Sequence, residues 1–298
     1  MRRIFYFNIN YGCDNNCIFC YSHNTQHRGI SYHEIPLNIF QRYLKENNIT
    51  AKDRVILNGG EPLLHTNINE ILYYLQKINC EVLVYSNGTH LINIDMASLS
   101  SKFRFIIPIH GYDILHDSIT RNYGSWVKTI NGMQTCINEG SCLLDLKIIL
   151  NENMFRSKEN WNKTCEMMLN VPFNNAVHLT KMADTIISKK NQCIHITQEK
   201  ANYYTKLLFE KFISKNCKIK LYDTCILGLK NYLMNNILEE LEKPEVFFKD
   251  HNQFRKIDIE DCTGCCSNKC DYKFFCISAV KQYKVLEYFD EKFYQNLE

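Results

Sequence analysis

Three cysteines near the start of the chain have a spacing that suits metal chemistry. Cys13, Cys17 and Cys20 follow the pattern C-x3-C-x2-C. Thiolates hold iron–sulfur clusters, and a cubane cluster normally takes four of them. Three thiolates therefore leave one iron without a protein ligand, so that this iron can bind a substrate. The alternative is a structural zinc site completed by His23 or a distant cysteine, but zinc usually takes four ligands that arrive as two short-spaced pairs.

A second motif follows the cysteines, in the run Asn58-Gly59-Gly60-Glu61-Pro62. Gly59 and Gly60 lack Cβ, so the backbone can approach a ligand closely there, although two adjacent glycines also suit an ordinary tight turn between a strand and a helix. Together and in this order, the cysteine pattern and this run resemble the radical S-adenosylmethionine (SAM) superfamily. The resemblance implies a [4Fe–4S] cluster on the three cysteines, with the amino and carboxylate groups of SAM on the open iron.

The resemblance also implies roles for residues beside the cluster loop. Residues 59–62 are expected to hydrogen-bond the SAM amino group, with Glu61 and Pro62 fixing the turn, and Phe19 is expected to lie against the adenine. Three further polar residues follow later strands: Ser86, Asn87 and His110. Polar residues at strand ends either contact SAM or substrate or only cap the next helix. Both interpretations stay open for these three residues.

A second group of cysteines lies near the C-terminus. The candidate ligands are Cys225, Cys262, Cys265, Cys270 and Cys276. They suit a second iron–sulfur cluster, and the resemblance implies a SPASM or twitch extension, although the usual SPASM pattern C-x2-C-x5-C-x3-C is not matched. One auxiliary [4Fe–4S] cluster is expected, with a zinc knot as the alternative. Cys266 is the candidate spare thiol, which either donates a hydrogen atom to a substrate radical or packs within the knot.

The rest of the composition favours a soluble, cytoplasmic protein. The N-terminus lacks the features of a signal peptide, and no segment approaches the apolar length of a membrane span. Fifteen cysteines in a reducing compartment favour metal ligation over disulfides. Six scattered cysteines are expected to behave as small apolar side chains: Cys80, Cys136, Cys142, Cys165, Cys193 and Cys217. The net charge is +3 with dispersed lysines and arginines, so neither nucleic acid nor a membrane is expected as a partner.

Hydrophobic periodicity predicts the elements that position these residues. Within residues 1–185, strands are expected at 4–9, 55–57, 82–85, 103–109, 144–150 and 176–180, and helices at 36–46, 67–78, 125–138 and 158–170. Such alternation predicts an α/β fold with a parallel sheet and crossover helices. The resemblance implies the partial (β/α)6 radical SAM barrel, in which the chemistry lies at the C-terminal edge of the strands. Asn67 and Glu70 predict a capping box at the start of the second helix.

Residues 186–298 are expected to form a helical linker and the small cysteine-rich extension. Helices are predicted at 198–216 and 227–241, with a short strand between them at 218–222. A polar loop is predicted between Pro244 and Cys262, and an amphipathic helix at 277–293 closes the chain.

The resemblance implies an enzyme that takes an electron from a reductant such as flavodoxin or ferredoxin. Such an enzyme is expected to cleave SAM to methionine and a 5′-deoxyadenosyl radical, which abstracts a hydrogen from the substrate. Because peptide and protein modification dominates among relatives with such an extension, maturation of a ribosomally made peptide, by crosslinking or epimerisation, is the first hypothesis.

Two other classes of protein stay open. A small-molecule dehydrogenase, or an enzyme that modifies a nucleoside or an aminocyclitol, would use the same clusters. Only about a dozen residues precede the cluster loop, which leaves no room there for a domain that recognises a leader peptide and favours this class. The third hypothesis is an iron–sulfur electron-transfer protein without catalytic activity. Such a protein would not need a SAM-binding motif like the one at residues 59–62.

Overall fold

The computed structural model describes residues 3–20, 34–182, 194–213, 215, 217–222, 245–250 and 253–257. The strands are β1 (Arg3–Asn10), β2 (Arg54–Gly59), β3 (Glu81–Tyr85), β4 (Phe103–Ile109), β5 (Leu143–Leu150), β6 (Ala176–Lys181), β7 (Lys218–Tyr222), β8 (Glu245–Asp250) and β9 (Gln253–Ile257). The helices are α2 (Leu37–Glu46), α3 (Ile68–Ile78), α4 (Asp113–Thr120), α5 (Ser125–Glu139), α6 (Lys158–Asn170) and α8 (Gln198–Ile213). Short 3-10 segments are η1 (Pro62–Leu64), η2 (Leu91–Asn93), η3 (Met96–Ser98) and η4 (Glu152–Phe155).

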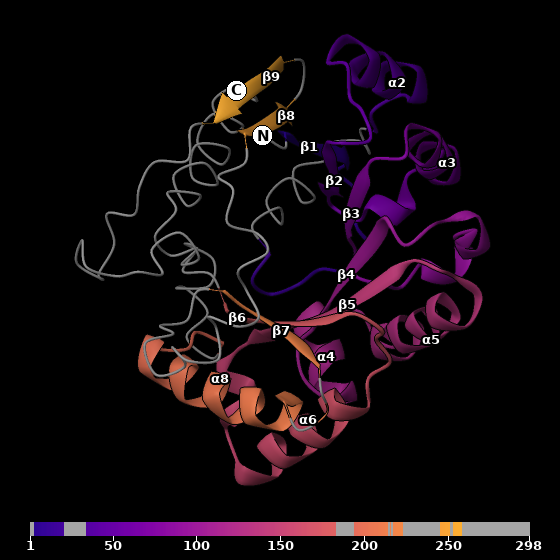
Figure 1. The fold of residues 1–298 in the computed structure, drawn as a ribbon. Coiled ribbons are helices and arrows are strands. Elements are labelled where there is room, and N and C mark those ends of the chain that lie inside the picture. Colours follow the sequence, from indigo (N-terminus) through magenta and orange to yellow (C-terminus); the bar gives the residue numbers. More distant parts are fainter. Residues whose placement is uncertain are drawn as a thin grey trace.

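The described strands form one sheet in the order β7-β6-β5-β4-β3-β2-β1-β8-β9 (Figure 1). Each neighbouring pair from β1 to β7 is parallel. Parallel strands need a connection that returns to the same end of the sheet, and helices commonly provide it. The predicted α/β fold with the architecture of a partial barrel is confirmed. Because the strands are parallel, the segments that follow β1, β2, β3 and β4 all begin at one edge.

The two faces of the sheet differ because side chains alternate along each strand. One face is apolar and packs under helices in a single core that includes Phe5, Leu57, Val84, Phe105 and Leu146. Helices α2, α3, α5, α6 and α8 lie along this outer face of the curved sheet (Figure 1). Their buried residues join the same core, for example Phe40, Leu72, Met133, Met168 and Leu208. Burial of this face therefore fixes which side chains point to the inside of the curve.

Charged residues lie on the inner face, toward the amino ends of the strands. Arg54 on β2 forms an ion pair with Glu81 on β3 at 3.0 Å. Arg104 on β4 lies 4.0 Å from Glu81 and 3.9 Å from Asp145 on β5. The Asp145 carboxylate in turn lies 2.6 Å from His178 Nε2 on β6. Oppositely charged neighbours therefore join β2 to β6 across the inside of the sheet.

Several predicted details are wrong. The segment predicted as a polar loop after Pro244 contains β8 and β9, and β8 pairs in parallel with β1. The sheet does not stop at six strands, because the predicted strand at 218–222 is β7 and pairs with β6. Asn67 does precede α3, but its side chain makes no capping hydrogen bond. Its backbone N–H, the donor that Glu70 would accept from in a capping box, instead donates to His65 Nδ1 at 3.0 Å.

Other predictions fall outside the described residues. They include the helices at 227–241 and 277–293 and the C-terminal cysteines. The division of the chain near residue 185 stays a prediction. No helix within the described ranges is long and apolar enough to cross a bilayer.

Candidate active site at the carboxyl ends of β1 to β4

The loop that carries Cys13, Cys17 and Cys20 begins directly after β1, and all three thiols are half-buried. The backbone N–H of Cys20 donates to the carbonyl of Cys17 at 3.0 Å, which closes a turn between them. The loop also rests on the end of α4. The N–H of Asn16 donates to the Thr120 carbonyl at 2.8 Å, and that of Ile18 donates to the Ile119 carbonyl at 3.0 Å. Helix α4 therefore supports the cysteine loop. No helix was predicted from the sequence at these residues.

The three thiols influence one another electrostatically. Burial, with smaller contributions from the neighbouring Glu61, Asp14 and Cys20, raises the pKa of Cys13 to about 12. Burial also raises the pKa of Cys17, with Cys20 and Cys13 adding to the effect. Thiolates in such a place need positive charge from a bound metal.

The three thiols of this loop are candidate metal ligands. In the described part of the chain, no three His, Cys, Asp or Glu side chains converge on a point where one metal ion could be held. An iron–sulfur cluster is wider than an ion, and its thiolates bind different irons. Three half-buried thiols on one loop are the kind of donors that such a cluster takes.

Gly59 and Gly60 bring the end of β2 against the cysteine loop. Gly59 has a φ of +134°, and a Cβ there would lie 2.1 Å from the Asn10 carbonyl oxygen. A Cβ on Gly60 would lie 2.3 Å from the Gly12 carbonyl oxygen. The N–H of Gly60 donates to the Asn10 carbonyl at 2.7 Å, and that of Glu61 donates to the Gly12 carbonyl at 2.7 Å. The close approach that the glycines permit is thus to the chain's own cysteine loop.

The buried side chain of Asn10 joins the same two segments. Its Nδ2 donates to the Glu61 carbonyl at 2.9 Å, and its Oδ1 accepts from the N–H of Gly12 at 2.8 Å. Asn10 was not among the site residues predicted from the sequence. A detectable signal was present, because Asn10 is an amide that ends a mostly apolar strand shortly before the first cysteine.

Glu61 links β2 to the end of β3. Its buried carboxylate accepts hydrogen bonds from the Leu63 N–H at 2.9 Å, the Ser86 hydroxyl at 2.8 Å and the Asn87 N–H at 2.6 Å. Burial raises the pKa of Glu61 to about 7, although these hydrogen bonds favour the ionised form. Pro62 is the first residue of η1, which begins at this point. Glu61 therefore stabilises the turn, and the Ser86 hydroxyl donates a hydrogen bond to the Glu61 carboxylate.

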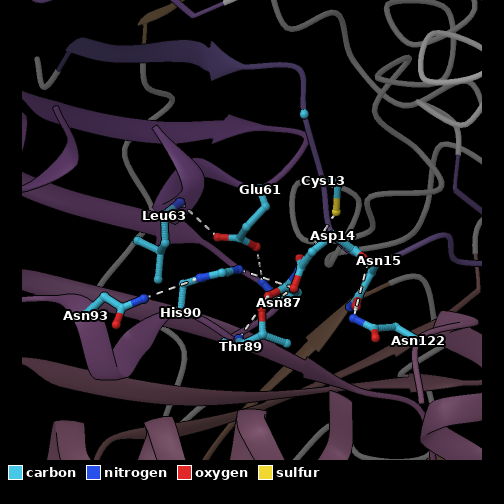
Figure 2. A network of polar contacts seen from close by, with 12 residues as sticks. Cys13, Asp14, Asn15, Glu61, Leu63, Asn87, Thr89, His90, Asn93 and Asn122 are labelled. Carbon is cyan, nitrogen blue, oxygen red and sulfur yellow. Dashed lines mark hydrogen bonds and ion pairs between the residues drawn. The ribbon is translucent and has the colours of Figure 1, made fainter. Parts of the chain in front are cut away.

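Asn87 connects Glu61 to the cysteine loop (Figure 2). Its Nδ2 donates to Asp14 Oδ1 at 2.7 Å and lies 3.8 Å from Cys13 Sγ. Asp14 Oδ2 accepts from the Thr89 hydroxyl at 2.8 Å and lies 3.3 Å from His90 Nε2. Asp14, Thr89 and His90 were missed as site residues, although Asp14 lies between two of the cysteines and Thr89 follows Asn87 closely.

Hydrogen bonds hold the Asp14 carboxylate in its ionised form. Burial by itself would raise the pKa of Asp14, but the contact with His90 and the hydrogen bonds from Thr89 and Asn87 outweigh it and lower the pKa to about 2. The same contact with Asp14 raises the pKa of His90. A negative charge is therefore fixed beside Cys13, the first of the predicted cluster ligands.

His110 follows β4 and lies beside Phe19 of the cysteine loop. The two rings have centroids 4.9 Å apart in an edge-to-face arrangement. On its other side His110 stacks on His116 at 5.3 Å. Burial lowers the pKa of His110 well below its usual range, so its imidazole is neutral. Within the described residues, His110 Nδ1 has no hydrogen-bond partner. Phe19 and His110 thus form an aromatic wall next to Cys17 and Cys20.

The structure brings the predicted residues from the first half of the chain to one edge of the sheet. Of the scattered cysteines, Cys80, Cys136, Cys142 and Cys165 are buried as expected, and Cys217 is half-buried. The remaining predicted site residues lie outside the described residues: Cys225, Cys262, Cys265, Cys266, Cys270 and Cys276.

Two curated proteins show partial similarity to this chain. AdoMet-dependent heme synthase of Methanosarcina barkeri is 24% identical over 135 residues, which cover 44% of this chain and 38% of that protein. 7-Carboxy-7-deazaguanine synthase of Halobacterium salinarum is 34% identical over 103 residues, which cover 33% of this chain and 37% of that protein. The chain therefore aligns with less than two fifths of either relative.

Solved structures share the fold at low sequence identity. SuiB of Streptococcus suis, in its complex with the precursor peptide SuiA, has a TM-score of 0.56 and 12% identity over 83% of this chain and 56% of that chain. SuiB has also been solved bound to SAM. Residues 7–154, which contain the cysteine loop, the Gly-Gly-Glu-Pro turn and the ends of β3 and β4, match the family model for the Radical SAM superfamily. This segment of the chain is therefore a radical SAM superfamily domain.

Proposed function

We propose that this protein is a radical SAM enzyme whose catalytic [4Fe–4S] cluster is held by Cys13, Cys17 and Cys20. One observation carries the proposal: the loop with the three thiols is hydrogen-bonded through Asn10 and Gly12 to the Gly-Gly-Glu-Pro turn. Cluster and SAM are the cofactors that the family implies. When bound and given an electron, they supply cleavage of SAM to methionine and a 5′-deoxyadenosyl radical, which abstracts a hydrogen from the substrate.

The chain's own residues hold and orient these cofactors. The three thiolates would hold the cluster, and the turn at residues 59–62 lies against the backbone of the same loop, where it would help to bind SAM. Phe19 and His110 offer an apolar, uncharged wall for the adenine. Glu61 acts through the backbone, because its carboxylate is occupied by Leu63, Ser86 and Asn87.

The substrate in this proposal is a ribosomally made peptide that is crosslinked or epimerised. The fold likeness to SuiB, which has been solved with a precursor peptide, favours this class. An auxiliary [4Fe–4S] cluster on Cys225, Cys262, Cys265, Cys270 and Cys276 belongs to the same proposal, with Cys266 as hydrogen donor. A flavodoxin or ferredoxin is the proposed reductant. A small-molecule substrate is the second candidate, favoured by the 34% identity to 7-carboxy-7-deazaguanine synthase.

The test of the enzyme class is cleavage of SAM. Protein reconstituted with iron and sulfide without oxygen, then given dithionite, should release 5′-deoxyadenosine from SAM. Cys17→Ala should abolish this release, because two thiolates should not hold a cluster with one open iron. Cys217→Ala, which removes a half-buried thiol at the start of β7, is the matched control and should leave the release unchanged. Full activity of Cys17→Ala would contradict the proposal.

The substrate class needs a separate experiment. Short peptides encoded beside the gene are co-expressed with the wild type or with Cys17→Ala and then compared by mass spectrometry. A mass change or solvent-deuterium incorporation that depends on Cys17 supports a peptide. Unchanged peptides, from cells in which the wild type still cleaves SAM, would favour a small molecule.

A further inference from the structure

The amide of Asn87 is aimed at two neighbours in the cysteine loop. Its Nδ2 lies 2.7 Å from Asp14 Oδ1 and 3.8 Å from Cys13 Sγ (Figure 2). An amide nitrogen carries two hydrogens, so it can donate to a carboxylate and to a sulfur together. Asn87 follows β3 and is 74 positions from Cys13 in the sequence. The contact therefore joins the first cluster ligand to a different strand of the sheet.

The orientation of this amide is determined by its other contacts. Asn87 Oδ1 accepts from the Thr89 N–H at 2.9 Å and lies 2.7 Å from the Thr89 hydroxyl. A flipped amide would place its oxygen against the Asp14 carboxylate and its N–H groups against the N–H of Thr89. Both contacts would then be repulsive. The nitrogen must therefore face Asp14 and Cys13.

The backbone of Asn87 is held as firmly as its side chain. Its N–H donates to Glu61 Oε2 at 2.6 Å, and its carbonyl accepts from the Thr129 hydroxyl at 3.0 Å. Thr129 belongs to α5 and is fully buried. The donor that faces Cys13 is thus fixed to the turn after β2 and to a helix of the outer layer.

We propose that Asn87 is a positioning residue for the cluster, which donates a hydrogen bond to the Cys13 thiolate and is aimed by Asp14. The inference rests on the proposed function, because it requires a cluster on Cys13. Hydrogen bonds to cluster sulfurs and the net charge nearby set the reduction potential of the cluster. The donated hydrogen bond stabilises the more negative, reduced cluster, whereas the Asp14 carboxylate opposes reduction.

The two residues therefore have opposite effects that can be measured. Asn87→Ala removes the donor and should shift the reduction potential of the SAM-binding cluster to a more negative value. Asp14→Asn removes the charge and should shift it to a more positive value. The measurement is a redox titration followed by electron paramagnetic resonance on the reconstituted full chain. The relevant signal is identified by its change when SAM is added, and iron per chain is counted in parallel.

Asn122→Ala is the matched control. The Asn122 side chain supports the same loop, because its Nδ2 donates to the Asp14 carbonyl at 3.2 Å and to Asn15 Oδ1 at 2.8 Å. Its removal loosens the loop without touching the Asn87 amide, so the potential should stay at the wild-type value. Equal shifts in Asn122→Ala and Asn87→Ala would show that only loop rigidity matters and would overturn the inference.

The remaining outcomes separate this inference from the proposed function. If the wild type takes up iron but has no signal that responds to SAM, the proposed function fails first. If the Asn87→Ala variant takes up no iron, the test rests on the reduction potential of the Asp14→Asn variant. A potential of that variant at or below the wild-type value would overturn the inference. Shifts of opposite sign at full iron content support it.

Discussion

At the residue scale, side chains other than the thiols build the cysteine loop into the fold. Asn10, Glu61 and Asn87 are polar, and each makes several hydrogen bonds, at least one of them to a segment distant in the sequence. Such contacts have defined lengths and directions, so they hold the loop against the neighbouring strand ends. They keep the thiols in place despite the burial that opposes their ionisation.

The close approach of Gly60 to the cysteine loop leads to a prediction at this scale. Gly60→Ala places a methyl group 2.3 Å from the Gly12 carbonyl oxygen, so the cysteine loop must move. We expect a loss of about 1–3 kcal/mol in the free energy of unfolding, the usual cost of overpacking, together with reduced iron uptake. Denaturant unfolding and iron analysis measure the two effects.

Gly124→Ala is the control for this substitution. Gly124 has a φ of +81°, but a Cβ at this position would have no atom within 4 Å, so alanine should cost about 1–2 kcal/mol through backbone conformation only. Its iron content should equal that of the wild type. If Gly60→Ala binds iron equally well, the close approach of the two segments does not matter for the cluster.

At the element scale, α4 and α5 act as a support for the cysteine loop. The loop rests on the last carbonyls of α4, and Asp117 of α4 caps the start of α5. The Asp117 carboxylate accepts from the Gly124 N–H at 2.6 Å, the Trp126 N–H at 2.7 Å and the Ser125 hydroxyl at 2.9 Å. One side chain therefore satisfies the exposed donors at a helix start and fixes the angle between two helices.

We predict that Asp117→Ala loosens this support. The loss of a capping side chain costs about 0.5–2 kcal/mol, and the freed end of α4 should hold the cysteine loop less firmly. The melting temperature should fall, and the cluster should be lost faster to a chelator than in the wild type. Asp95→Ala is the control, because Asp95 precedes η3 without a capping hydrogen bond from its side chain. Similar chelation rates in both variants would argue against a role for α4 in the site.

At the scale of the whole molecule, the curved sheet separates two kinds of surface. Its outer face is an apolar core shared with the helices, whereas its inner face carries the charged series from Arg54 to His178. In that series Asp145 is fully buried, and its pKa is lowered because hydrogen bonds from His178 and Asn175 outweigh the effect of burial. The charges therefore stabilise the inner face by pairing with one another. They lie near the amino ends of the strands, whereas the site lies at the carboxyl ends.

Removal of Asp145 tests this arrangement. Asp145→Ala removes the carboxylate that pairs with His178 on β6 and with Arg104 on β4. We expect destabilisation of about 3–5 kcal/mol, the usual effect of breaking a buried ion pair, seen as a lower denaturant midpoint. Glu159→Ala breaks the exposed pair with Lys163 and should leave the midpoint unchanged. Equal midpoints for Asp145→Ala and the wild type would contradict the account of the inner face.

The sequence alone determined the local parts of this protein. The spacing of Cys13, Cys17 and Cys20, the run at residues 58–62 and the alternation of strands and helices are all patterns within short windows. Each depends on residues close together in the chain, so the chemistry of thiolates and the periodicity of side chains could be recognised directly. The strands from β1 to β6 and helices α2, α3, α5 and α6 were predicted on this basis.

Only the tertiary structure decided which distant segments meet. The contacts of Asn10 with Glu61 and of Asn87 with Cys13 span 51 and 74 positions, and no local pattern encodes them. The pairing of β8 with β1 was missed for the same reason, because a strand is stabilised by a partner that can lie anywhere in the sequence. The parallel order of the strands brings their carboxyl ends to one edge, and that order turns separate motifs into a single site.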